Sequence, residues 1–175
     1  MLDLSITEFL NEYSTEALNF KALLEMMQSS GIEFRNRRMI GPLGVATFYC
    51  IYLDIENIKY SCSEKMIYFT ILHEMAHYKR ICRMGKGTLI EMLSLEDQEA
   101  FCQHVIGEEI VADRYACYVY QCLNGKEYPR HMTQQLHLSQ AQDLYKPMII
   151  RYMFGKVKNN EETYIALWEG FIVND

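Results

Sequence analysis

The sequence lacks the features that mark secreted and membrane-spanning proteins. Its N-terminus, MLDLSITEFLNEY, carries acidic residues early and has no basic start followed by an apolar run, so we expect no secretory signal peptide. No stretch reaches the roughly 18 consecutive apolar residues that a transmembrane helix needs. These absences predict a cytoplasmic protein that has no membrane partner.

Cysteine pairs of the CxxC type are also missing. The cysteines are spread singly along the chain, at Cys50, Cys62, Cys82, Cys102, Cys117 and Cys122. Without a CxxC pair, the sequence gives no local indication of a thiolate zinc site or a redox motif. In a reducing compartment we expect these thiols to be unpaired, buried and unreactive.

Positive charge is scarce as well, since 17 lysines and arginines stand against 23 aspartates and glutamates. The net charge of -6 argues against nucleic acid as the main partner, because phosphate binding depends on a cationic surface. We interpret the one basic run, RNRR from Arg35 to Arg38, as a solvated turn or strand. Repeats, low-complexity runs and linkers are absent, so residues 1–175 are expected to form a single domain.

The hydrophobic periodicity predicts an α+β fold in which a small β-sheet packs on a helical body. Residues 1–60 are expected to begin with two helices, one opened by the capping box SITE at Ser5 and one running from Ser14 to Gly31. The segment 31–55 is rich in β-branched and aromatic residues and is interrupted by GPLG. This pattern is typical of two or three strands with a turn.

A pair of helices is expected at residues 61–128. A second capping box, SCSE, opens the first helix at Ser61, and the glycines of RMGKG end it near Cys82. The segment GEEIVADRYACYVYQCL forms the second helix, which Gly125 closes. Residues 129–175 are expected to be a C-terminal helical region.

The first of these two helices contains the stretch TILHEMAHYK, in which two histidines stand four residues apart. At this spacing His73 and His77 lie on one face of a helix and can direct two imidazole nitrogens at one Zn²⁺ ion. Glu74 is rotated by about 100° from His73, so it can reach a water on the metal without being a ligand. This HExxH pattern predicts a zinc peptidase with Glu74 as general base.

A third ligand is expected from the following helix. The segment EEIVADRYA places Glu109 and Asp113 four residues apart, in the one Glu-x-x-x-Asp pattern of the chain. Glu109 is therefore predicted to bind zinc, while Asp113 accepts a hydrogen bond from the far nitrogen of a liganding histidine. Glu108 is a weaker rival because it does not share a face with Asp113, and His104 is similarly misdirected.

The two segments together resemble the ImmA/IrrE-type metallopeptidases. YFTILHEMAHY at residues 68–78 is similar to their aromatic-Thr-x-x-His-Glu-x-x-His helix, and EIVADRYA at residues 109–116 is similar to their Glu-x-x-Ala-(Asn/Asp)-x-x-Ala helix. The similarity covers well under half of the chain. Asp113 stands where the family more often has asparagine, which changes the charge at this position and keeps a hydrogen-bond acceptor.

The resemblance implies a zincin core of the gluzincin-like type and a cytosolic protease. It implies zinc ligands at His73, His77 and Glu109, a general base at Glu74 and a supporting role for Asp113. It further implies action on, or near, helix-turn-helix transcriptional repressors as protein substrates.

Peptide hydrolysis also needs a hydrogen-bond donor for the developing oxyanion, and the sequence leaves this donor open among Tyr115, Tyr118, His131 and His137. A substrate strand is expected to pair with an exposed sheet edge around ATFYCIYLD. Two other interpretations remain. The first is a non-catalytic, zinc-stabilised protein that docks a regulatory partner. Such a protein would have no use for a general base at Glu74. The second is a latent protease covered by the segment around Trp168.

Overall fold

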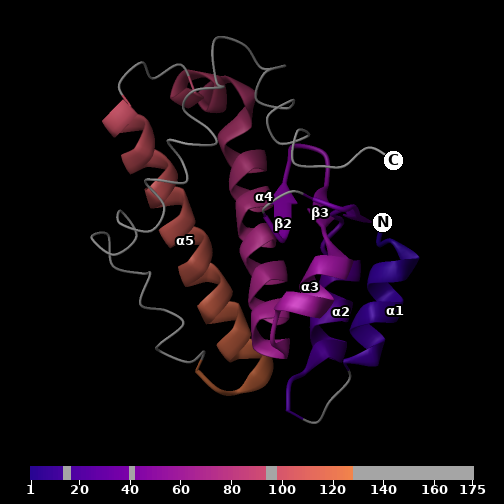
Figure 1. Cartoon of the computed structure of the whole chain (residues 1–175). Helices are drawn as coiled ribbons and strands as arrows, with labels where there is room; N and C mark the ends of the chain where they lie inside the picture. Colours follow the sequence, from indigo (N-terminus) through magenta and orange to yellow (C-terminus); the bar gives the residue numbers. More distant parts are fainter. Residues whose placement is uncertain (14–16, 40–41, 94–97, 128–175) are drawn as a thin grey trace.

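The structure, a computed structural model, describes residues 1–13, 17–39, 42–93 and 98–127, with the backbone alone described at 85–93, 98, 99 and 101. It is an α+β fold, as the sequence predicts (Figure 1). In these ranges the helices are α1 (Leu4–Glu12), α2 (Phe20–Ser29), α3 (Ile55–Ser61), α4 (Glu64–Leu93) and α5 (Gln98–Asn124). The strands are β1 (Phe34–Asn36), β2 (Gly44–Ala46) and β3 (Ile51–Leu53). The C-terminal helical region expected at 129–175 lies outside the described residues.

The two N-terminal helices begin at different residues from those predicted. The carboxylate of Asp3 accepts the backbone N–H of Ser5 at 3.0 Å and so caps α1, which makes Ser5 a helical residue and the predicted capping box wrong. In the same way Asn19 caps α2 by accepting the N–H of Ala22 at 3.0 Å. Helix α2 therefore starts later than Ser14. In both cases an acidic or amide side chain accepts an N–H group that the start of the helix leaves without a backbone partner.

The sheet has the strand order β1-β3-β2, with β1 parallel and β2 antiparallel to β3. The outer side of β1 is covered, because Leu2 forms a parallel bridge with Phe34. The outer edge of β2 is not exposed either, since all three residues of this strand are buried. The expectation of an exposed edge for strand pairing in this segment is therefore wrong for β2.

Helix α3 was not predicted from the sequence. Asp54 ends the sheet and starts the helix: its buried carboxylate accepts the N–H groups of Asn57, at 3.0 Å, and Met39, at 2.7 Å. The next helix, α4, begins at Glu64, and the hydroxyl of Ser63 accepts the N–H of Met66 at 3.4 Å. The predicted capping box at Ser61 is therefore wrong, since Ser61 closes α3 instead.

Helix α4 also runs further than predicted. It passes through Gly85 and Gly87 to Leu93, although the RMGKG segment was expected to end it. A glycine inside a helix costs about 1 kcal/mol relative to alanine, which weakens a helix without terminating it. Helix α5 starts earlier than expected and ends as expected: Asn124 is its last residue and Gly125 has φ 65°.

Helix α4 lies between the sheet and α5 and contacts both (Figure 1). One face of α4 packs into the core, where Ile67, Ile71 and Leu72 are fully buried. The core extends from there into both the sheet and the N-terminal helices. Across the described ranges, no helix combines the length and apolar character needed to cross a membrane. The fold thus places α4 with one side against β2 and the other against α5.

Candidate metal centre

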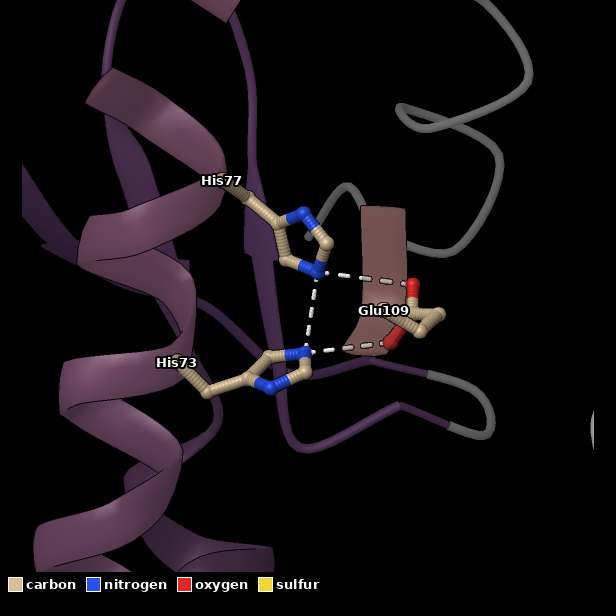
Figure 2. Close-up of side chains that lie close together, drawn as sticks. All are labelled: His73, His77 and Glu109. Atoms are coloured by element: carbon tan, nitrogen blue, oxygen red, sulfur yellow. Dashed lines mark hydrogen bonds and ion pairs between the residues drawn. The ribbon is translucent and has the colours of Figure 1, made fainter. Parts of the chain in front are cut away.

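Three side chains meet between α4 and α5. His73 and His77 project from successive turns of α4, and Glu109 reaches them from α5 (Figure 2). The two Nε2 atoms are 2.9 Å apart, and the Glu109 carboxylate oxygens lie 3.1 Å from His73 Nε2 and 3.4 Å from His77 Nε2. One ligand atom from each residue lies within 4.8 Å of the other two, so this group could hold a metal ion.

The separations suit a small tetrahedral cation. Ligands about 2.0–2.2 Å from a zinc ion in tetrahedral geometry lie about 3.3–3.6 Å from one another. The three observed separations, 2.9, 3.1 and 3.4 Å, are within a few tenths of an ångström of that range. The side chains are 14%, 17% and 20% exposed, so a bound ion would keep a route to solvent. Two imidazoles and one carboxylate therefore leave room for a further ligand such as water.

Asp113 lies behind this group, one turn after Glu109 on α5. Its carboxylate is buried and sits 2.8 Å from Nδ1 of His73. When Nδ1 donates its proton to Asp113, the lone pair of the His73 ring is left on Nε2, which faces Glu109 and His77. A carboxylate in this position therefore favours the tautomer with the proton on Nδ1 and restrains the orientation of the His73 ring.

The charges in this group are strongly coupled. Burial would lower the pKa of His73, but its hydrogen bonds to Asp113 and Glu109 outweigh burial and hold this pKa well above its ordinary value. Burial would likewise raise the pKa of Glu109, yet the neighbouring His77 and His73 hold it well below its ordinary value. Both shifts favour the charged forms, so in the metal-free protein the group favours a positive charge at His73 beside the Glu109 carboxylate.

Glu74 leaves α4 on the side that faces β2. The residue is only 8% exposed, and its carboxylate accepts the backbone N–H of Ala46. Burial raises the pKa of Glu74, and the nearby His73 and His77 oppose this shift without cancelling it. The carboxylate is thus a buried base next to the two histidines, outside the group of three side chains that could hold the ion.

The rival residues are placed elsewhere. Glu108 forms a two-pronged ion pair with Arg80, which includes a contact of 2.5 Å between Nη2 and Oε1. His104 Nε2 is 3.9 Å from Glu108 and does not reach the group of three. Arg80 was not singled out from the sequence, although it follows His77 by three residues and so lies on the same face of α4.

Two of the four candidate oxyanion donors, Tyr115 and Tyr118, lie among the described residues. The Tyr115 hydroxyl accepts a hydrogen bond of 2.7 Å from Lys79. Lys79 lies about 140° around the α4 axis from Glu74, so this contact is on a different side of the helix from Glu74. Tyr118 is 68% exposed. His131 and His137 lie outside the described residues, as does the segment around Trp168.

Comparison of the chain with protein-family models, with curated proteins and with solved structures found no match. The case for this site therefore rests on the geometry and chemistry of its own residues.

Proposed function

We propose that the protein is a zinc-dependent peptidase that hydrolyses peptide bonds of a cytosolic protein. The observation that carries this proposal is Glu74, a buried carboxylate directly beside a group of two histidines and one glutamate. Three ligands suffice to hold a metal, so a fourth ionisable group with a raised pKa needs another explanation. General-base catalysis provides that explanation.

The residues divide the chemistry between them. A bound zinc ion would supply a Lewis acid that lowers the pKa of a coordinated water toward 7 and polarises the scissile carbonyl. His73, His77 and Glu109 would hold the ion, and Asp113 would keep the proton of His73 on Nδ1. Glu74 would accept the proton of the attacking water and pass it to the leaving amine, for which a pKa above the ordinary glutamate value is favourable.

The substrate class and the location of the protein belong to the same proposal. The resemblance to ImmA/IrrE-type peptidases, with their zincin core, supports a helix-turn-helix transcriptional regulator as substrate. All six cysteines are free thiols, and this supports a reducing compartment such as the cytoplasm.

A second candidate is a non-catalytic, zinc-stabilised protein that docks a regulatory partner. One observation favours it: Glu74 accepts the N–H of Ala46 and so joins α4 to β2, which gives this carboxylate a structural use. The two candidates differ in what the loss of the Glu74 charge should do. A base is indispensable for hydrolysis, whereas a neutral amide can keep the contact with Ala46.

The test is Glu74→Gln, with Glu56→Gln as the matched control because Glu56 is exposed on α3. Both variants and the parent are expected to bind about one zinc per chain in metal analysis. Hydrolysis of denatured casein is expected to fall by about 10²–10⁴-fold in Glu74→Gln alone. A parent protein that binds zinc without cleaving any peptide would favour the docking protein, and a variant as active as its parent would refute the peptidase proposal.

A further inference from the structure

Gly44, the first residue of β2, lies directly against the side chain of Glu74. A Cβ atom added at Gly44 would be 2.7 Å from Cγ of Glu74, 3.1 Å from Cδ and 3.2 Å from Oε1. Contacts below about 3.0 Å are closer than carbon atoms can pack, so either β2 or Glu74 would have to move. The space that a side chain would fill at Gly44 is therefore the space that Glu74 occupies.

Glu74 has little freedom to give way. The atom nearest to the added Cβ is Cγ, which stands only two bonds from the α4 backbone and cannot swing aside like the end of a long side chain. The carboxylate beyond it is buried and accepts the N–H of Ala46 from the same strand. Helix α4 packs on β2 along this line (Figure 1), so the helix and strand cannot separate freely either.

The backbone gives no other reason for glycine at this position. Gly31 and Gly125 have φ values of 73° and 65°, which only glycine adopts easily, and neither would bring a Cβ within 4 Å of another group. Gly44 has no positive φ. Among the described glycines, what distinguishes Gly44 is its contact with Glu74.

We propose that Gly44 is a positioning residue for the Glu74 carboxylate. It leaves the side of β2 open so that Glu74 can lie flat against the strand, and the N–H of Ala46 then fixes the direction of the carboxylate. This inference rests on the proposed function, in which that carboxylate is the general base. An alanine at position 44 would push the base away from the water that it has to deprotonate, while His73, His77 and Glu109 stay in place.

The experiment compares Gly44→Ala with Gly107→Ala in the full chain. Gly107 lies in α5, where an added Cβ meets nothing within 4 Å, so its substitution is the matched control. We expect Gly44→Ala to lower kcat on denatured casein by about 10²-fold, because a shift of about 1 Å is enough for such a loss. KM should change by less than about twofold, and zinc content should stay at about one per chain. An unchanged kcat, or a loss of zinc together with kcat, would overturn the positioning role.

A thermal unfolding cycle tests the contact itself and does not depend on activity. Gly44→Ala is expected to lower Tm by about 3–8 °C in the parent, and by less than about 1 °C in a Glu74→Ala background, where the opposing atoms are gone. If the single variant does not fold, a double variant that does fold leads to the same conclusion. An equal fall in both backgrounds would overturn the inference. A parent without peptidase activity would refute the proposed function alone, since the cycle would still report whether Gly44 places Glu74.

Discussion

Removing the Asp113 carboxylate should weaken metal binding although Asp113 is not a ligand. Its oxygen lies 2.8 Å from Nδ1 of His73, on the side of the ring opposite to Nε2. Without this acceptor, the His73 ring is free to rotate and to place its proton on Nε2, the atom that should bind the ion. Asp113→Ala and Asp113→Asn separate the two contributions of the carboxylate, because asparagine keeps an acceptor and loses only the charge.

The magnitude follows from the role of such supporting contacts. Loss of a hydrogen-bond partner behind a liganding histidine typically costs about 10–100-fold in metal affinity. We therefore expect Asp113→Ala to bind zinc about 10–100-fold more weakly than the parent, a loss of about 1.4–2.8 kcal/mol. Asp113→Asn should lose less than about tenfold, or about 1.4 kcal/mol, since its amide oxygen can still accept from Nδ1.

The assay is competition for zinc between the metal-free protein and a chromophoric chelator at fixed pH and ionic strength. Arg114→Ala serves as the control, because Arg114 is the exposed neighbour of Asp113 on α5. Parent and control should bind alike, and the order of affinities should be parent, Asp113→Asn, Asp113→Ala. An Asp113→Ala variant that binds zinc within twofold of the parent would refute the role assigned to this carboxylate.

Two further outcomes follow from the charges and one from the core. Zinc binding at pH 7 should release about one proton from His73, because the pKa of this residue is raised. Calorimetry in buffers of different ionisation enthalpy detects this proton, and a binding enthalpy that does not depend on the buffer would contradict the prediction. In the metal-free protein, the stabilisation from protonated His73 is lost as pH rises through its raised folded-state pKa. The stabilisation from ionised Glu109 is lost as pH falls below about 4.5. The Tm of the metal-free protein should therefore peak between these limits, and a flat profile of Tm against pH would contradict this. Leu72→Ala, at a fully buried position, should cost about 2–5 kcal/mol in urea unfolding, and a cost below 1 kcal/mol would show that Leu72 is not in the core.

The parts of the site that depend on local geometry could be read from the sequence. The four-residue spacing of His73 and His77 puts both rings on one face of any α-helix, whatever surrounds it. The same spacing relates Glu109 to Asp113. What spacing cannot supply is the approach of two helices, and the structure brings α4 and α5 together at these residues. Whether the site binds zinc and cleaves peptides stays a prediction.

The parts that depend on competition between neighbours could not be read so well. The helix caps were misplaced because Asp3 and Ser63 accept backbone N–H groups at the starts of α1 and α4, where the capping-box pattern favoured Ser5 and Ser61. Gly44 was interpreted as part of a turn, because its contact partner Glu74 lies 30 residues further along the chain. A glycine chosen for the space it leaves looks the same in a sequence as one chosen for its backbone conformation.

The most direct test of the central claim is anomalous scattering from crystals grown with zinc, recorded on both sides of the zinc absorption edge. We expect one strong peak per chain between α4 and α5, about 2.0–2.2 Å from His73 Nε2, His77 Nε2 and a Glu109 oxygen. A map in which these three side chains are ordered and no peak lies among them would contradict the claim.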